Sequence, residues 1–466
     1  MSLSNITNRC ADHLYSYHAT YIRNLRARHW TRVSQTVRPL NRTSETMKTR
    51  TLVSTLAFTL GMLLISFFSG CARTDHPQET TTAAKYLFIW AGDADEKDSD
   101  FLAVIDARRS QPTYGQVVAT VPVGARATMP HHTEYEYPSN EILFANGWVA
   151  GRTFMINLRD PLEPRLAGQF TSIEGYSFPH SFARLPNGNV LSTFQAKGDR
   201  YVPPGGLVEM DAQGRGVRAA SAATAEIDST LTWPYSLVVL PEIDRAVSTS
   251  ADMGMPPWDE WTYHDTYHVQ IWSLKELRLV ASVPLPEVQQ GPYHIGPAEP
   301  RVLSDGSVYV NTFNCGLYRL YGIDSDAPKA AFVHSFPGGT PMGMECAVPV
   351  VYGHYWIQTV PALPGLIVLD VSDPAKPVEV SRLMLDQRYP MPHWLAADRR
   401  SGRLVVTGDG GSWVLIVALD EETGALTVDE AFQDKGVSHA GIDFARLQWP
   451  HGETGAAIVH GALFGK

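Results

Sequence analysis

The chain has 466 residues and a formal net charge of −10, and its 44% hydrophobic and 18% charged residues describe an ordinary globular protein. The negative charge argues against a nucleic-acid partner, because binding to phosphates needs a basic face. Four cysteines are too few for a disulfide scaffold, whereas 37 Gly and 32 Pro are typical of many short strands joined by turns.

The N-terminal region is not expected to belong to the fold. Residues 1–46 form a basic leader with seven arginines and no sustained periodicity. They are interpreted as residues upstream of the true start, with a cytoplasmic tail as the alternative. Residues 47–70 contain Lys48 and Arg50, then the apolar run Leu52–Phe68, which is the order of a secretory signal.

The end of this signal indicates how the protein is held after export. Ser69 and Gly70 precede Cys71, so the segment resembles a bacterial lipoprotein signal whose cysteine becomes lipidated. A plain membrane anchor is the alternative. Residues 71–84 are polar and are expected to form a flexible tether. We therefore expect a periplasmic lipoprotein that contacts the membrane by its N-terminal lipid alone.

From Lys85 onward, strand-like runs recur with turn signals between them, and no stretch indicates a long amphipathic helix. Phe178–Phe194 shows the unit: a strand that opens on Pro179-His180, a tight turn, and a returning β-rich strand. Counting back from the small residue that ends the second strand of each copy gives one register position, near the start of its first strand. These positions, 46 to 64 residues apart, are His132, His180, Tyr235, Glu299, Glu345, His393 and His439.

Seven copies at this spacing predict an all-β fold, a seven-bladed β-propeller of four-stranded blades over residues 85–466. A pair of β-sandwiches would not explain a motif that is repeated seven times. The strands from Tyr86 to Val123 have no opening strand of their own. They are expected to complete the last blade with strands near the C-terminus, and the register residues are expected to ring one mouth of the channel.

Histidines and glutamates at one register position predict a metal site. Imidazole and carboxylate are ligands of divalent transition metals, and several nitrogens favour copper or nickel over calcium, while zinc would also accept them. The alternative is a polar ring that holds water. His131 is either a further ligand or a group that orients His132. Glu299, Glu345 and Tyr235 are the candidate catalytic residues beside the metal.

Two features surround the expected mouth. The aromatic and acidic insertion Met253–His268 follows a second strand, so it is either a lid over the ring or an ordinary long loop. Cys315 and Cys346 fall on the same face of neighbouring blades. A disulfide, two buried thiols and a thiolate at the metal remain open.

Extended collinear similarity carries a family resemblance. The best patch is Asp100–Val123, followed by the paired His131-His132, and matching patches continue to Gly465. They include Ile142–Leu166, Phe178–Asp211, Tyr235–Thr249, Val269–Trp272, Glu299–Tyr321 and Ser438–Pro450. Over this range the chain resembles the selenium-binding protein / methanethiol oxidase family. The resemblance implies a seven-bladed propeller with a histidine-coordinated metal, which is copper in the bacterial oxidases.

The resemblance also implies an activity. Those oxidases convert methanethiol, O2 and water into formaldehyde, hydrogen sulfide and hydrogen peroxide. The implied copper ligands are His131, His132, His180 and His439. Selenium-binding members have cysteines shortly after the paired histidines, whereas this chain has Thr133–Pro138 there. His393 is a further departure, which adds a ligand or shifts the metal geometry.

The sequence thus predicts a copper-dependent oxidase whose partners are a small thiol and O2. A non-catalytic metal-binding lipoprotein and a metal-dependent, lactonase-like hydrolase are the alternatives.

Overall fold

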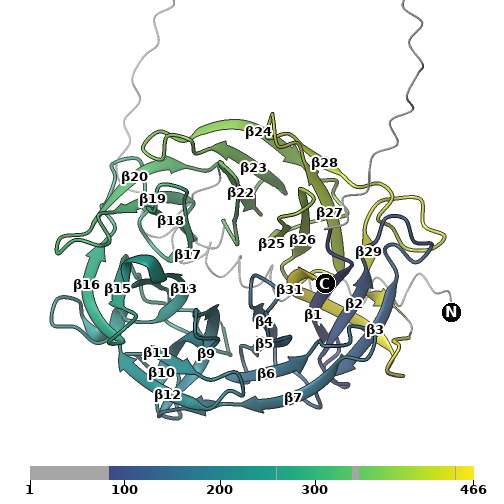
Figure 1. Cartoon of the computed structure of the whole chain (residues 1–466), viewed down its shortest axis with the longest axis horizontal. Coiled ribbons are helices and arrows are strands. Elements are labelled where there is room, and N and C mark those ends of the chain that lie inside the picture. Colours follow the sequence, from purple (N-terminus) through teal and green to yellow (C-terminus); the bar gives the residue numbers. More distant parts are fainter. Residues whose placement is uncertain (1–82, 259, 338–345, 447) are drawn as a thin grey trace, which may run out of the picture.

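The structure, a computed structural model, describes residues 83–466 except 259, 338–345 and 447. Seven antiparallel sheets stand around a central axis, and the chain runs once around the ring (Figure 1). The predicted all-β, seven-bladed β-propeller of four-stranded blades is confirmed, and three blades carry a short fifth strand. In the described ranges the helical elements are two 3-10 turns, η1 (Ser229–Leu231) and η2 (Pro241–Ile243), and none is long and apolar enough to cross a membrane.

The strands of each blade follow from the innermost outward. Blade I contains β4 (Pro130–Thr133), β5 (Ile142–Gly147), β6 (Arg152–Asn157) and β7 (Arg165–Phe170). Blade II contains β9 (Tyr176–Arg184), β10 (Val190–Lys197), β11 (Gly206–Met210) and β12 (Gly216–Ser221), with β8 (Ser172–Ile173) beside β9. Blade III contains β13 (Pro234–Leu240), β14 (Arg245–Ser250), β15 (His268–Ser273) and β16 (Arg278–Pro284). Blade IV contains β17 (Pro297–Val302), β18 (Val308–Thr312), β19 (Gly316–Tyr321) and β20 (Lys329–Ser335).

The remaining blades follow the same order. Blade V contains β21 (Val350–Tyr352), β22 (Tyr355–Val360), β23 (Gly365–Asp370) and β24 (Val378–Met384). Blade VI contains β25 (Pro392–Asp398), β26 (Arg403–Gly408), β27 (Trp413–Leu419) and β28 (Leu426–Val428), with β29 (Ile442–Asp443) paired to β27. Blade VII contains β31 (Gly455–Gly465), β1 (Tyr86–Asp93), β2 (Phe101–Asp106) and β3 (Val117–Pro122), with β30 (Ala445–Arg446) beside β31.

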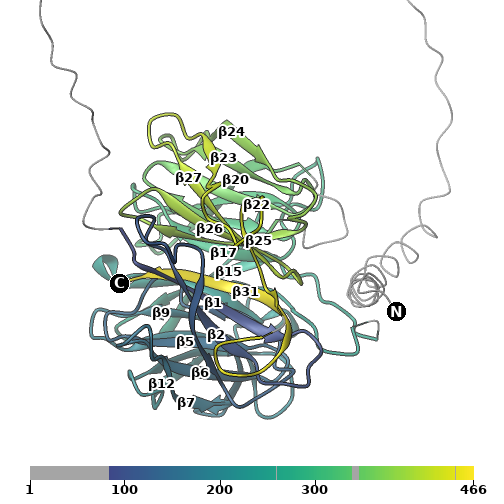
Figure 2. The same cartoon turned by 90° about the vertical axis from the view of Figure 1, so that its right-hand side faces the viewer.

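Blade VII joins strands from the two ends of the described chain. β31 pairs antiparallel with β1, with Tyr86 opposite Gly465 (Figure 2). The expected closure of the ring is therefore confirmed. Blade VI also contacts the chain beside β1 and β2, because the guanidinium of Arg403 donates hydrogen bonds to the backbone oxygens of Ala84 and Ala107.

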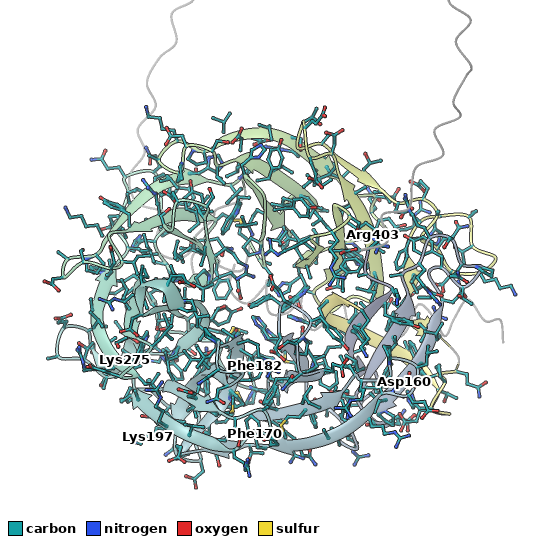
Figure 3. The ribbon with its side chains drawn as sticks, in the orientation of Figure 1. Asp160, Phe170, Phe182, Lys197, Lys275 and Arg403 are labelled. Atoms are coloured by element: carbon teal, nitrogen blue, oxygen red, sulfur yellow. A yellow bond between two sulfur atoms is a disulfide. The ribbon has the colours of Figure 1, made fainter. Side chains whose placement is uncertain are left out.

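The core lies between neighbouring blades. Middle strands such as β2 are buried along their whole length, because each blade packs against two others, whereas the outermost β7 alternates exposed and half-buried residues. Lys275 and Asp160 accordingly lie on the outer edge of the ring, and the buried Phe182 lies further in (Figure 3).

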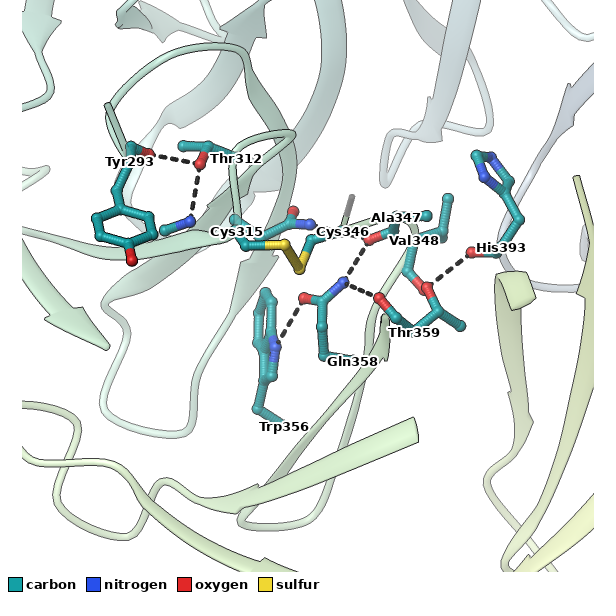
Figure 4. The surroundings of a disulfide bond; sticks show 12 residues. Tyr293, Thr312, Cys315, Cys346, Ala347, Val348, Trp356, Gln358, Thr359 and His393 are labelled. Atoms are coloured by element: carbon teal, nitrogen blue, oxygen red, sulfur yellow. Dashed lines mark hydrogen bonds between the residues drawn. A yellow bond between two sulfur atoms is a disulfide. The ribbon is translucent and has the colours of Figure 1, made fainter. Parts of the chain in front are cut away.

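A disulfide joins Cys315 of blade IV to Cys346, which precedes blade V (Figure 4). Neither sulfur is therefore present as a thiolate ligand. The segment after Cys346 is tied to blade VI, since the Val348 N–H and the Thr359 hydroxyl both donate to the backbone oxygen of His393, each at 2.9 Å (Figure 4).

Candidate metal centre

Histidine rings from four blades meet at the axis. In order around the channel they are His393 of β25, His460 of β31, His131 and His132 of β4, and His180 of β9. Ring centroids of successive neighbours lie 4.5, 4.2, 4.6 and 4.2 Å apart. We call these five residues the histidine cluster. The structure thus brings together His131, His132, His180 and His393, as expected from the repeat.

Local backbone geometry explains why the adjacent residues His131 and His132 both face the cluster. Successive residues of a regular strand face opposite ways, but the pairing of β4 with β5 shifts register between Pro130 and Thr133. The rings of His131 and His132 consequently stack with an interplanar angle of 9°.

A glycine allows the C-terminal strand to approach β4. A Cβ at Gly461 would lie 2.9 Å from the backbone oxygen of His131 and 3.1 Å from the backbone nitrogen of Thr133, so any larger residue would push the strands apart. This close approach lets Nδ1 of His460 donate to the oxygen of His131 at 2.9 Å.

Hydrogen bonds at one ring nitrogen orient the other. Nδ1 of His180 donates to the backbone oxygen of Tyr235 at 2.8 Å, and Nδ1 of His132 lies 3.0 Å from the Ser181 hydroxyl. Such contacts fix the tautomer and ring direction of metal-binding histidines. They leave Nε2 of His132 and His180 to face the cluster.

Buried ring nitrogens without partners provide the test of fit to a metal. In the described part of the chain, His131 Nδ1, His132 Nε2 and His180 Nε2 are buried and lack a hydrogen-bond partner. Candidate ligand atoms of these three residues all lie within 4.8 Å of one another. Buried polar atoms are rarely left unsatisfied, and an ion about 2.0–2.1 Å from each nitrogen would satisfy all three. The residues fit a transition metal.

Burial keeps the imidazoles of the cluster in the neutral form that can bind a metal. Burial, followed by the positive charge that neighbouring imidazoles would carry, lowers the pKa of His131 and His132 well below the usual value. Burial also lowers the pKa of His180 and of His460 to about 3. These imidazoles are therefore neutral at pH 7, as metal ligation requires.

A carboxylate from the opposite side of the channel faces the cluster. Oε1 of Glu299 lies 3.7 Å from Nε2 of His132, which is too long for a hydrogen bond but short enough for two ligands of one ion. Oε2 accepts hydrogen bonds from Tyr135 at 2.6 Å, Ser236 at 2.8 Å and Arg301 at 2.9 Å. The Glu299 side chain is therefore held by one oxygen.

The other sequence-predicted catalytic residues differ in position. The ring of Tyr235 packs on His180, with centroids 4.1 Å apart. Burial, reinforced by the negative charge of Glu299, raises the pKa of the Tyr235 phenol well above its usual value, so it stays protonated. Glu345 and the proposed lipidation site Cys71 lie outside the described residues.

The expectation for His439 is corrected. This half-buried residue lies shortly before β29, which pairs with β27 of blade VI, and its Nδ1 lies 3.0 Å from the backbone oxygen of Ala440. His460 fills the seventh position instead. The error arose because each register position was found by counting back from the end of the second strand of its blade. In blade VII the second strand is β1, at the other end of the chain, so the count started from a wrong strand. The expected ring closure was the signal that could have identified His460, since it assigns the last apolar strand to the innermost position of blade VII.

Asp409 was also missed. It directly follows β26, so the Asp-Gly-Gly sequence at 409–411 looks like an ordinary turn. In the structure, Asp409 lies with His393 and His460, and candidate ligand atoms of these three are within 4.8 Å of one another.

Side chains of the insertion Met253–His268 pack against an aromatic group that reaches the cluster. It follows β14 at the end where Ser250 pairs with Pro234, and its Trp258 and Trp261 pack against a buried aromatic group. That group includes Trp148, whose ring centroid lies 5.5 Å from that of His180. The insertion thus packs beside the cluster, and its role as a lid stays a prediction.

A cavity of about 490 Å³ lies toward the other ends of the innermost strands. Its walls include Phe182, Leu237 and Leu395, and it reaches Tyr135 and Arg301. Those two side chains donate hydrogen bonds to Glu299, so they stand between the cavity and the carboxylate that faces His132.

Comparison with known proteins supports the resemblance. No family model matches the chain. A methanethiol oxidase of Hyphomicrobium sp. is 30% identical over 150 residues, which are 30% of this chain and 34% of the relative. A methanethiol oxidase of Ruegeria pomeroyi is 26% identical over 179 residues, 36% of this chain and 40% of the relative. The match thus spans about a third to two fifths of the length of these relatives.

Solved structures share the fold. A hypothetical selenium-binding protein from Sulfolobus tokodaii has a TM-score of 0.66 at 16% identity, covering 82% of this chain and 94% of that chain. A periplasmic gluconolactonase of Pseudomonas aeruginosa has a TM-score of 0.55 at 12% identity, covering 80% and 97%. The resemblance to the selenium-binding protein / methanethiol oxidase family is confirmed.

Proposed function

We propose that this protein is a copper-dependent oxidase of methanethiol or a related small thiol. The observation that carries the proposal is the set of three buried imidazole nitrogens, unpartnered among the described residues, that face one another in the channel. The similarity to proteins named methanethiol oxidase supports the reaction class.

The donor set favours copper. Neutral imidazoles bind copper and zinc well, but zinc has no redox chemistry, and oxidation of a thiol by O2 requires a metal that exchanges electrons. His131, His132 and His180 would hold the ion, which would supply the electron exchange between thiol and O2. The balanced reaction is CH3SH + O2 + H2O → HCHO + H2S + H2O2.

Glu299 is the proposed proton acceptor. A thiol binds copper as a thiolate, so its proton must leave, and Oε1 of Glu299 faces the cluster without another hydrogen-bond partner in the described chain. Arg301, Tyr135 and Ser236 keep that oxygen directed inward by holding the other one. Tyr235 is proposed to position His180 through its ring and its backbone oxygen.

The surroundings suit a small apolar substrate. Aromatic side chains of Trp148 and the insertion shield His180 from bulk water on one side, and on the other side a cavity lined by apolar and charged residues would admit the thiol once Tyr135 or Arg301 moves. A site meant only to store or deliver a metal has no need of a proton acceptor beside the metal ligands.

We also propose that the protein works in the periplasm as a lipoprotein anchored through Cys71. Export would keep hydrogen peroxide out of the cytoplasm. Replacement of Cys71 by Ser should move the protein from the membrane fraction to the soluble periplasmic fraction, and unchanged membrane association would reject the lipid anchor.

Oxygen uptake tests the function. Purified protein from copper-supplemented cells should consume O2 when methanethiol is added and should release formaldehyde, hydrogen sulfide and peroxide in equal amounts. The double variant His132→Ala/His180→Ala should lose the copper held by His131, His132 and His180 together with the activity, whereas His439→Ala should keep both. Copper binding without O2 uptake for any small thiol would favour a metal carrier, and hydrolysis of a lactone by the zinc-loaded protein would favour a hydrolase.

A further inference from the structure

The histidine cluster contains two groups of candidate ligands. The first is His131, His132 and His180, and the second is His393, Asp409 and His460. Candidate ligand atoms lie within 4.8 Å of one another inside each group. The two groups touch where the rings of His131 and His460 stack, with centroids 4.2 Å apart.

We infer that the second group binds its own divalent transition-metal ion, so that the channel holds two ions side by side. Two histidines and one carboxylate form a donor set that holds divalent iron in many enzymes and also suits zinc and copper. The inference adds a second ion to the channel of the proposed function. It rests on the proposed function only in taking the first ion to be bound by His131, His132 and His180.

One ion cannot use the whole cluster. Ligands about 2.0–2.2 Å from a shared ion lie at most about 4.4 Å from each other. Even at a wider limit of 4.8 Å, the candidate ligand atoms of the described residues separate into two groups, with His131, His132 and His180 in one and His393, Asp409 and His460 in the other. The two groups therefore need separate ions.

The second group is built on rigid backbone. Pro392 of β25 pairs with Gly408 of β26, and His393 and Asp409 each lie one residue away from this antiparallel pair. The Asp409 N–H donates to the backbone oxygen of Met391 at 2.9 Å, which fixes the start of the turn. Both ligand positions are thereby set by the same pair of strands.

His460 is held from two sides. Its Nδ1 donates to the backbone oxygen of His131, so Nε2 is the atom available to a metal. Its own backbone oxygen accepts a hydrogen bond from the hydroxyl of Thr407 on β26. The strand that carries His460 is thus joined to the strand that precedes Asp409, and the three ligands belong to one rigid unit.

Charge also favours a cation at this place. Asp409 adds a carboxylate beside His393 and His460, and its negative charge acts on His460 in the folded protein. The first group is balanced in the same way by Glu299 on its far side. Each of the two ions would therefore have one carboxylate of its own.

Metal counting tests the inference. The full chain is stripped with a chelator, loaded with Cu²⁺ alone or Zn²⁺ alone, desalted and analysed for metal per chain. We expect two ions in the wild type, one in Asp409→Asn and one in His393→Ala. The matched control is Asp326→Asn, an exposed aspartate between β19 and β20, which should keep two. Circular dichroism of each metal-free variant checks that it is folded.

Electron paramagnetic resonance provides a second readout. Two Cu²⁺ ions in contacting ligand groups should broaden each other's signals, and Asp409→Asn should give the sharp spectrum of an isolated ion. One ion per chain in the wild type, or two that both persist in Asp409→Asn and His393→Ala, would overturn the inference.

The variant His180→Ala separates this inference from the proposed function. If His180→Ala loses the single wild-type ion while Asp409→Asn keeps it, the second site fails and the proposed copper site stands. If His180→Ala loses nothing while Asp409→Asn loses an ion, the proposed copper site fails and the second site stands.

Discussion

Nε2 of His132 lies 3.7 Å from Oε1 of Glu299, a carboxylate on β17 three blades further around the ring. Both atoms are buried, and across the described residues neither has a hydrogen-bond partner. The other carboxylate oxygen accepts three hydrogen bonds. One oxygen therefore positions the side chain, and the other is left for chemistry.

Replacement of Glu299 by Gln should preserve the shape of the site but remove the proton acceptor. We expect kcat to fall by about 10²–10⁴, the usual contribution of general acid–base catalysis, with copper content unchanged. Tyr135→Phe, which removes one of the three hydrogen bonds to Glu299, should have a much smaller effect. A Glu299→Gln variant with normal kcat would exclude the proposed role, and loss of copper would make Glu299 a ligand.

Replacement of Gly461 by Ala should disturb the cluster without removing a ligand. The added Cβ would meet the backbone of β4 at 2.9 and 3.1 Å, and backbone atoms cannot move aside cheaply. We expect β31 to shift away from His131 and the metal affinity of the protein to fall. Competition with a chelator of known affinity measures this change, and an unchanged affinity would mean that the close approach of the two strands is not needed.

Asp429 should make stability depend on pH. Burial raises the pKa of this carboxyl, but hydrogen bonds from Arg109 and Tyr114 outweigh it and hold the pKa below its usual value. Because the folded-state pKa is the lower one, the stabilisation is complete above the unfolded-state value, near pH 4, and is lost as pH falls through the folded-state pKa. Asp429→Asn should lower the free energy of unfolding by about 1–2 kcal/mol at pH 7, and by less in acid.

Urea unfolding at several pH values measures this difference. The control is Asp386→Asn, whose ion pair with Arg388 is about half exposed on both sides and should contribute little. Equal destabilisation at pH 7 and in strong acid would contradict the assigned cause.

Loss of the disulfide should weaken the fold but not the metal site. Its cysteines are 31 residues apart in sequence, and chain entropy for such a loop corresponds to about 3–4 kcal/mol. Cys315→Ser/Cys346→Ser should lower the melting temperature and keep its copper, because the sulfurs are bonded to each other. A folded variant that has lost copper would instead indicate that a cysteine reaches the metal.

The repeat made most of the fold predictable. A motif that recurs seven times fixes the architecture, and the unpaired strands before His132 predicted how the ring closes. His131, His132, His180 and His393 were identified because their strands follow the repeat. His460 was not, because its blade is assembled from both ends of the chain and a count along the sequence cannot cross that joint.

The surroundings of the cluster were harder to predict. Tyr135 and Arg301 hold Glu299, but neither occupies a register position, and their contacts depend on how side chains from separate blades meet. Asp409 has the appearance of a turn residue. The disulfide was one of three open alternatives, because spacing alone does not decide whether two cysteines come within bonding distance.

The pairing of β31 with β1 has a consequence for biosynthesis. The ribosome makes β1 near the start of the propeller and β31 at its finish, so a growing polypeptide lacks the His460 imidazole until the two have met. A copy that is truncated or clipped before this strand keeps most of its blades but cannot complete the ring of ligands. Such a copy lacks one ligand of the second proposed ion, so the two neighbouring ions can be bound together only after synthesis has reached β31.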